Sequence, residues 1–456
     1  MQEKHHFSSP IREWLNDSRA TGILLLGCAF ISLFLSNGPS VGWYMNLWNG
    51  RMTLPGGLHL PDTILSWVNN FMMAFFFLLV STEIKREWVA GELSSFKNAI
   101  LPLGAAFGGM MVPALLFIVF NLHTGFSHGW GIPTATDIAF SLAAASLLGK
   151  RFPVKLKIFL MALAIIDDLG AILVIAVFYG GHLQWPYLIG SGLIYLLLLG
   201  CRYFKIRFGL LQVLLGFGLW YTMLQSGVEA SIAGVLFAFA MPIASLSVIE
   251  KAIHKYVNFL VLPLFALANT TLVIHSNVFD SLTTHIGLGI ICGLVIGKPL
   301  GIFLVSRVMV GLKIARLPAN INWRQFFGMG SLAGIGFTMS IFTTMLAFSS
   351  PVARDIAKVA ILASIAVSVA VSFVYFWMIN HLPIPTRTPP SSGTPSSTRY
   401  SAASPPPPYF PSYNSTPVVY AVSLHSPDRT LTSAAPPAHP DGIPTAGSPH
   451  PAPARL

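Results

Sequence analysis

Long apolar runs, each ended by glycine, proline or charged residues, dominate the chain up to about residue 380. A membrane-spanning helix needs about 20 mainly apolar residues, and most of these runs approach that length. The pattern therefore predicts an all-α polytopic membrane protein with about twelve transmembrane helices. The predicted spans lie near 20–36, 64–82, 99–121, 134–148, 156–178, 186–201, 208–224, 228–243, 256–274, 285–306, 328–348 and 356–380.

Two of these spans are predicted to be interrupted helices. The run at 134–148 is short and follows Gly129, Gly131 and Pro133, and the run at 328–348 carries four glycines. Irregular backbone at membrane depth has to be buried in protein or line a cavity, because lipid offers it no hydrogen-bond partner. We therefore expect both interruptions to lie inside the protein.

Other local patterns predict a hairpin and close helix contacts. Between the first two spans, β-prone pieces flank Asn49-Gly50 and favour a small extracytoplasmic hairpin at about 41–60. Small residues four positions apart allow helix backbones to approach closely in membranes. Such spacings occur at Gly104/Gly108 and Gly330/Gly334.

Composition divides the chain into three parts. Residues 1–19 are polar and predict a cytoplasmic N-terminal segment, whereas 20–382 hold all the predicted spans. Residues 383–456 contain 19 of the chain's 33 prolines, with Ser, Thr and Ala between them. Such a segment cannot bury a core, so we expect a disordered cytoplasmic tail.

Charged residues are scarce and unevenly placed. Only 9% of residues are charged, whereas soluble domains carry about 25%. The net charge of +11 could indicate a nucleic-acid partner. With twelve spans and a cytoplasmic N-terminus, however, nearly all of the 27 Lys and Arg fall on the cytoplasmic side. This positive-inside pattern predicts both termini in the cytoplasm and no nucleic-acid partner. The exceptions are Arg51, Lys298, Arg354 and Lys358.

Ionisable side chains inside the apolar runs are the strongest functional signal. Each costs about 2.5–3.5 kcal/mol even on the milder insertion scale, so it indicates a functional site. Of the sixteen Asp and Glu, four lie within predicted spans, and Lys298 lies well inside the tenth. The four are Asp137, Asp167, Asp168 and Glu229.

Asp137 follows Thr134-Ala135-Thr136 at the first interruption. Hydroxyls and freed backbone carbonyls are hard oxygen ligands that suit a small cation, so this stretch is a candidate ion site. The alternative is an aspartate that only caps a broken helix.

Asp167 and Asp168 are adjacent, with apolar residues on both sides. Neighbours on a helix point about 100° apart, so one carboxylate can face an aqueous cavity while the other faces a partner helix. Two carboxylates this close do not both ionise easily in a low dielectric, which suits a site that takes up and releases protons. A pair at the end of a span is the alternative.

Lys298 is flanked by apolar residues and does not fit the phosphate-loop pattern. Because no helix end is within reach for snorkelling, a buried counter-ion for one of the aspartates is favoured.

Glu83 and Glu87 lie one helical turn apart at the end of the second span. They are compatible with a solvated helix end that forms internal ion pairs or with a regulatory role.

In this order, these residues resemble the NhaA family of bacterial sodium/proton antiporters, over about residues 10 to 380. The motifs are specific as a set, although each alone is weak. They are Phe75–Glu87 (FFFLLVSTEIKRE), Pro133–Phe140 (PTATDIAF), Ala164–Gly170 (AIIDDLG), Gly297–Gly301 (GKPLG) and Gly334–Ser340 (GIGFTMS).

The resemblance implies inverted repeats formed by spans three to five and ten to twelve, whose broken helices, the fourth and eleventh spans, cross at mid-membrane. Asp168 and Asp167 would form the sodium site, with Asp168 the main carrier of sodium and protons. Lys298 would pair with Asp167. Thr136 and Asp137 would lie at the crossing, where Asp137 would balance the helix-end dipoles. Positions tied to pH response would be Glu83, Glu87, Glu250 and His254.

Three positions depart from the family pattern. Glu229 and Lys251 stand where the best-known members have histidines, and Asn70 replaces an acid. A buried carboxyl at 229 would switch between neutral and negative, whereas a histidine switches between positive and neutral, so Glu229 could still sense pH. The alternative is that it stays protonated, hydrogen-bonds a neighbouring helix and senses nothing.

The resemblance implies secondary active transport, the exchange of Na⁺ and also Li⁺ for H⁺ across the bacterial inner membrane. By the same resemblance, the exchange would be electrogenic and would serve pH and sodium homeostasis. The three cysteines are widely spaced, and the thirteen histidines show no ligand spacing. We therefore expect no disulfide framework, no cofactor and no enzyme activity. The expected partners are Na⁺, H⁺ and the lipid bilayer, with a homodimer as one possible assembly.

Three other functions stay open on the sequence alone. A symporter of organic anions would need more cationic groups within the spans than Lys298. A cation channel would need a repeated filter or a symmetric ring of side chains. A membrane scaffold would use the buried charges only to fix helix packing.

Overall fold

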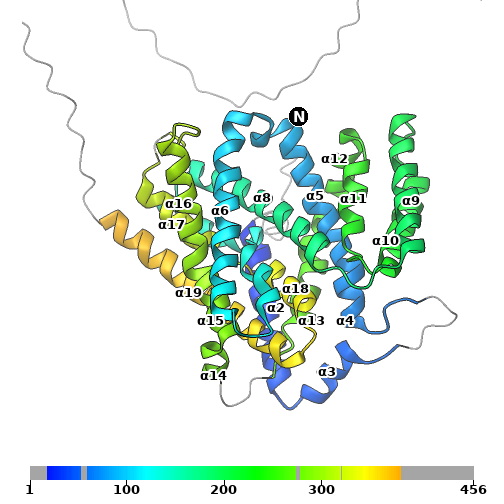
Figure 1. Ribbon diagram of the computed structural model, residues 1–456, viewed down its shortest axis with the longest axis horizontal. Coiled ribbons are helices and arrows are strands. Elements are labelled where there is room, and N and C mark those ends of the chain that lie inside the picture. The colour runs from blue at the N-terminus through cyan, green and yellow to red at the C-terminus, as the bar shows by residue number, and fades with distance from the viewer. Residues whose placement is uncertain (1–17, 53–58, 274–277, 320, 382–456) are drawn as a thin grey trace, which may run out of the picture. The chain divides into compact units, whose positions relative to one another are not determined.

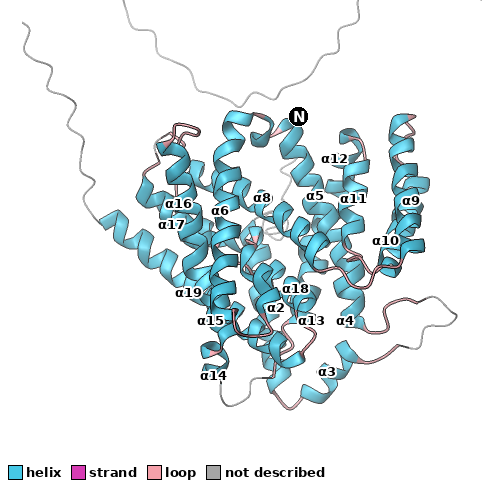
Figure 2. Cartoon of the chain, viewed as in Figure 1, coloured by secondary structure: helices cyan, strands magenta, loops and turns pink. Residues whose placement is uncertain are grey.

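The computed structural model describes residues 18–52, 59–273, 278–319 and 321–381. Within these ranges nearly the whole chain is helical and no strand is present (Figure 2). The tail predicted at 383–456 and nearly all of the N-terminal segment lie outside the described residues. Expectations about those two parts stay predictions.

Eight helical segments of the described chain are long and apolar enough to cross a membrane, and one bent pair adds a ninth. Apolar runs form helices here because a segment in lipid has to satisfy its own backbone hydrogen bonds. The all-α polytopic class is thereby confirmed. The count of twelve is not, because α7 (Ile138–Leu147), α10 (Leu210–Ser226) and α11 (Ile232–Ala240) are shorter than a full crossing. The continuous long helices are α2 (Ser18–Asn37), α6 (Phe96–Asn121), α8 (Val154–Phe178), α9 (Trp185–Tyr203) and α19 (Pro351–His381).

The other three long segments each contain a π-helical turn. In two of them a proline follows the turn, Pro263 and Pro299. A proline ring clashes with the preceding turn of a regular α-helix, and a wider turn relieves that clash. The turn before Pro299 therefore places Lys298 at the start of α16. The segments are α4 (Ile64–Trp67), η1 (Val68–Met72) and α5 (Met73–Ala90); α12 (Ile243–Tyr256), η5 (Val257–Val261) and α13 (Leu262–Asn269); and α15 (His285–Ile291), η6 (Cys292–Gly297) and α16 (Lys298–Gly311).

The hairpin expected at 41–60 is wrong. Val41–Asn49 forms helix α3, and the only strand-like pairing among the described residues is one isolated bridge. Tyr44 and Trp48 lie one helical turn apart on the buried face of α3, with ring centroids 6.0 Å apart in an edge-to-face contact. Packing of these aromatic side chains therefore outweighs their preference for strands.

The remaining short elements are η2 (Glu92–Ser94), η4 (Gly149–Arg151) and α14 (Val278–Thr283).

The two interrupted spans are found where they are predicted. In the first, the 3₁₀-helix η3 (Ser127–Thr134) is followed by three non-helical residues before α7 begins. In the second, α17 (Trp323–Ala333) and α18 (Thr338–Ala347) are bent by 50° at their break. The N–H of Asp137 donates to the carbonyl of Ile335 over 2.7 Å, so the two breaks lie against each other.

Helices α6 and α16 lie side by side and cross at two glycines (Figure 1). A Cβ atom on Gly108 would lie 2.3 Å from the carbonyl oxygen of Gly301, and one on Gly301 would lie 2.1 Å from that of Gly108. Similarly, a Cβ on Gly334 would lie 2.4 Å from the carbonyl oxygen of Leu294. The close contacts predicted from the glycine spacings are confirmed at these positions.

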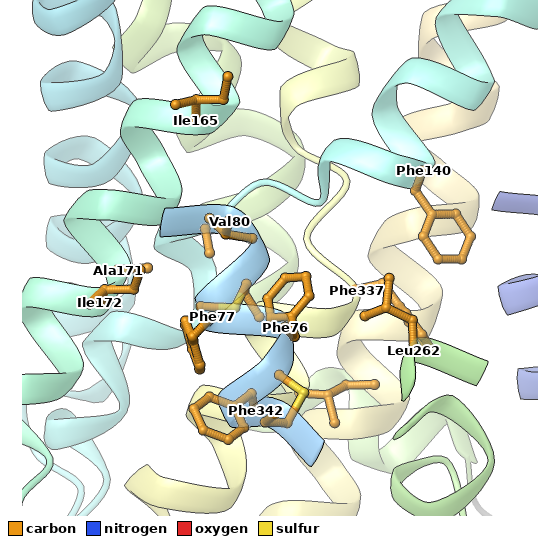
Figure 3. Packing of buried hydrophobic residues seen from close by; sticks show 14 of the residues in the cluster. Phe76, Phe77, Val80, Phe140, Ile165, Ala171, Ile172, Leu262, Phe337 and Phe342 are labelled. Carbon is orange, nitrogen blue, oxygen red and sulfur yellow. The ribbon is translucent and has the colours of Figure 1, made fainter. Parts of the chain in front are cut away.

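Large apolar side chains pack around the crossing of the broken helices (Figure 3). Phe77 of α5 contacts Phe342 of α18 with ring centroids 5.5 Å apart, and Phe140 of α7 contacts Phe337 at 5.1 Å. All four side chains are buried. Such edge-to-face aromatic pairs add stability beyond the area that they bury, so they help to fix the position of both breaks.

Candidate functional site

Asp137 joins the starts of two helices. It is the N-cap of α7, and its Oδ1 accepts a hydrogen bond from the N–H of Phe140 at 3.1 Å. Its Oδ2 accepts from the N–H and the hydroxyl of Thr338, the first residue of α18, at 3.1 and 2.7 Å. Helix N-termini carry partial positive charge, which one carboxylate offsets here for two helices. The capping geometry is therefore present, and a role for Asp137 at an ion site stays a prediction.

Asp167 and Lys298 form a fully buried ion pair. Asp167 Oδ2 lies 2.9 Å from Lys298 Nζ. The hydroxyl of Thr136 lies 2.7 Å from the same oxygen, and Lys298 also donates to the carbonyl of Thr134. A buried pair needs such added hydrogen bonds, because both charges have lost their water. The expected contact of Lys298 with the first aspartate of the doublet is thus present.

Asp168 is not part of this ion pair and lines a cavity of about 240 Å³. The residue is only 2% exposed, and its Oδ1 has no hydrogen-bond partner in the described part of the chain. This is the division of roles that the 100° step between helix neighbours predicts. Asp137, Asp167, Glu83 and Lys298 all lie close enough to interact with Asp168 electrostatically.

The cavity connects Asp168 to the end of α5 and to α12. Its inner wall holds Thr136, Asp137 and Thr338, and Glu83, Glu87, Arg86 and His254 also line it. Phe76, Val80, Ile165 and Leu262 form part of its apolar wall and are drawn in Figure 3. Carboxylate and hydroxyl oxygens are the ligands that small hard cations prefer. No group of three or more His, Cys, Asp or Glu that could hold a metal ion occurs among the described residues.

Two further predicted positions lie outside the cavity wall. Glu250 forms an ion pair with Arg86, which does line the cavity. Glu229 lies in the turn between α10 and α11, half-buried, and its Oε1 accepts from the N–H of Ser231 at 3.5 Å. Except for Glu229, every predicted site residue therefore lines the cavity or belongs to one of two ion pairs, Asp167–Lys298 and Arg86–Glu250.

Thr338 is a site residue that the sequence reasoning did not single out. It follows the break at Gly334-Ile-Gly-Phe337, and Thr136 lies within the non-helical stretch 135–137 that follows η3. A hydroxyl residue close to a glycine-containing interruption is the shared pattern that could have identified it. Arg86 is a second such residue, because it lines the cavity and forms an ion pair with Glu250.

Known proteins match almost the whole membrane domain. The family model described as Na+/H+ antiporter 1 matches residues 12–376. The chain is 45% identical over 360 residues to the Na(+)/H(+) antiporter NhaA of Flavobacterium psychrophilum, which covers 77% of this chain and 92% of that relative. It is 46% identical over 353 residues to the Na(+)/H(+) antiporter NhaA of Dechloromonas aromatica, covering 75% and 89%. This multi-pass membrane protein therefore belongs to the Na+/H+ antiporter 1 family.

Proposed function

We propose that this protein is a secondary transporter that exchanges Na⁺ for H⁺, with Asp168 as the shared binding group. One observation carries the proposal: a buried carboxylate, with one oxygen unbonded within the described chain, lies at the inner end of a cavity with acidic walls. A carboxylate can hold a proton or help to coordinate Na⁺, and binding of one weakens binding of the other. Exposure of that site to the two sides in turn then forces exchange.

The neighbours of Asp168 have distinct roles in this proposal. Asp137 offsets the positive ends of α7 and α18, so these helix ends do not repel a cation that reaches Asp168. Asp167 supplies a second carboxylate, held in place by Lys298 and Thr136. The ion pair also ties α8 to α16 at the depth of the site.

The pH response is assigned to the groups at and beside the outer cavity wall, Glu83, Glu87, His254 and Glu250 with its partner Arg86. An ionised carboxylate in the wall attracts Na⁺ toward Asp168, and a protonated one does not. Acidification should therefore weaken the supply of cations to the site. The Arg86–Glu250 pair would set how much of this negative charge is free to act.

We further propose a location in the bacterial inner membrane with both termini in the cytoplasm, which the distribution of Lys and Arg supports. Li⁺ should be accepted as a second small hard cation. Exchange of more than one proton per Na⁺ would make transport electrogenic and sensitive to membrane potential. The proposal needs no enzyme activity and no cofactor, and a homodimer stays a prediction.

Everted membrane vesicles test the proposal. Vesicles are acidified by respiration, and a pH dye then reports the inner proton concentration. Addition of Na⁺ should dequench the dye, because Na⁺ enters as H⁺ leaves, whereas K⁺ should not. A symporter would need an organic anion for flux, a channel would pass Na⁺ without moving protons, and a scaffold would do neither. Vesicles with normal protein levels and no Na⁺-dependent signal at any pH would overturn the proposal.

A further inference from the structure

A second cavity, separate from the one that Asp168 lines, has basic walls. Its volume is about 710 Å³, and it lies between the start of α6, the start of α8 and the segment that follows α16. Lys97, Lys155, Lys313 and Arg316 line it, and its described lining residues include no Asp or Glu. The cavity at Asp168 has the opposite character, because Glu83 and Glu87 line it. The two cavities should therefore attract ions of opposite sign.

Among the described residues, no ion pair neutralises the four basic side chains. All four residues are exposed, and none of the ion pairs in the described chain involves them. Like charges around one cavity repel each other, and the attraction of a bound anion to each of them offsets that repulsion. Exposure also leaves the cavity open to a ligand.

Two helix ends add to the positive potential. Lys97 and Lys155 are the second residues of α6 and α8, and neither helix has an acidic residue in its first turn or a side-chain hydrogen bond from its N-cap. Helix N-termini favour anions and disfavour cations, so lysines at these positions are unfavourable by themselves. An anion in the cavity would interact well with the lysines and with both helix ends.

The size and the donors of the cavity point to phosphate chemistry. Lysine ammonium groups bind phosphate as point charges, and the guanidinium of Arg316 can bind two of its oxygens at once. The volume admits a whole headgroup or a chain of phosphates. Ile158 and Ile314, 39% and 53% exposed, also line the cavity and could contact an acyl chain.

We propose that this cavity binds a phosphate-bearing anion, either the headgroup of an anionic phospholipid or a soluble polyphosphate. The ligand would hold together the ends of α6, α8 and α16. Two of these helices also carry the ion site, since Asp167 and Asp168 belong to α8 and Lys298 to α16. Binding should therefore stabilise the helices that hold the ion site, without occupying it.

Thermal unfolding of the purified full-length protein distinguishes the two sources. The protein in detergent is titrated with potassium pyrophosphate and, separately, with short-chain phosphatidylglycerol or phosphatidylcholine of equal chain length, at constant ionic strength. A ligand that binds only the folded state raises the melting temperature. A rise with phosphatidylglycerol alone assigns a lipid headgroup, and a rise with pyrophosphate alone assigns a soluble anion. Absence of any rise with both anions would overturn the proposal.

Variants then test whether the rise comes from this cavity. Replacement of Lys97, Lys155, Lys313 and Arg316 by Gln should weaken binding about fivefold for each charge removed. The matched control removes four other exposed charges, with Lys205, Arg207, Lys251 and Lys255 replaced by Gln, and should keep the wild-type affinity. Equal affinities of the two variants would contradict the proposed location.

A smaller change covers the case in which the fourfold variant inserts poorly, because Lys and Arg also set membrane topology. Arg316→Gln alone should weaken binding about fivefold. Arg316→Lys, which keeps the charge, should lose less affinity than Arg316→Gln. Wild-type affinity in Arg316→Gln would exclude this guanidinium from the site and overturn the proposal.

Discussion

Thr338 donates its hydroxyl hydrogen to Asp137 over 2.7 Å, across the point where two broken helices meet. The same carboxylate also accepts from the backbone of Thr338 and of Phe140, so one side chain completes the first turns of α7 and α18. The start of α18 thus takes its cap from the other break, whereas α7 is capped by its own N-cap residue. The two interruptions are therefore one structural unit, built from segments about 200 positions apart in sequence.

Replacement of Asp137 should weaken this unit. Loss of one N-cap costs about 1 kcal/mol, so Asp137→Ala, which removes two, should lower the free energy of unfolding by about 2 kcal/mol. Thr338→Val removes only the hydroxyl bond and should cost less. Unfolding of the purified variants by heat or denaturant in detergent measures both effects. A wild-type stability for Asp137→Ala would show that Asp137 caps neither helix effectively.

The buried pair of Asp167 and Lys298 predicts a larger effect. Lys298→Ala leaves a buried carboxylate without its counter-ion and should destabilise the protein by about 3–5 kcal/mol. The double variant Lys298→Ala with Asp167→Asn removes both charges and should recover part of that loss. A double-mutant cycle of melting temperatures measures the coupling. Additive effects of the two substitutions would show that the pair does not stabilise the fold.

Asp168 should be required for exchange but not for folding. Asp168→Asn keeps the size of the side chain and removes the negative charge that Na⁺ and H⁺ would share, so exchange should fall to background at every pH. Asp168 is not part of the buried ion pair, so the variant should insert and melt like wild type. The vesicle assay together with protein levels in the membrane checks this. Substantial Na⁺-dependent proton flux by Asp168→Asn would remove the central claim about the site.

The sequence predicts the helices and breaks well because each rests on a local signal. Apolar length predicts a span, and the glycines near 129–131 and 334–336 predict an interruption. The hairpin at 41–60 fails because the strand preference of Trp and Tyr is weaker than the packing that they gain on one face of α3. Helix α11 is shorter than the span predicted at 228–243, because residues 227–231 form the turn before it and Pro242 ends it.

The candidate site is less predictable, because it depends on how distant segments pack. The apolar surroundings of Asp167 and Lys298 predict a counter-ion pair, and the structure contains it. The sequence does not predict which residues line the cavity, because Thr338 and Arg86 come to line it only when α18 and α5 pack beside α8. The sequence predicts Glu229 within an apolar span, whereas the structure places it half-buried in the turn between α10 and α11 and off the cavity wall.

Removal of the Pro-rich tail tests where the transporter domain ends. The family match ends at residue 376, and the residues after 381 lie outside the described structure. Because a segment of this composition cannot bury a core, truncation after Pro385 should leave the exchange rate per inserted molecule nearly unchanged. Vesicle assays normalised to protein in the membrane compare the two forms. A large loss of rate with normal insertion would make the tail part of the transporter.

Glu83 and Glu229 should differ in their influence on the pH profile. Glu83 lines the cavity that leads to Asp168, whereas Glu229 lies in the turn between α10 and α11 and does not line it. Gln imitates the protonated carboxyl at every pH. At high pH, where the wild-type Glu83 is ionised, Glu83→Gln should therefore raise the apparent KM for Na⁺ about fivefold, which corresponds to about 1 kcal/mol of lost attraction.

At low pH the wild-type Glu83 is itself protonated, so the two forms should have the same KM and the variant's pH profile should be flatter. Glu229→Gln is the matched control, because it makes the same chemical change outside the cavity, and its profile should superimpose on that of wild type. Exchange measured as a function of pH for the wild type and the two variants makes this comparison. A shifted profile for Glu229→Gln would mean that this carboxyl takes part in the pH response from outside the cavity. An unchanged profile for Glu83→Gln would mean that the charge of the cavity wall does not set the supply of Na⁺.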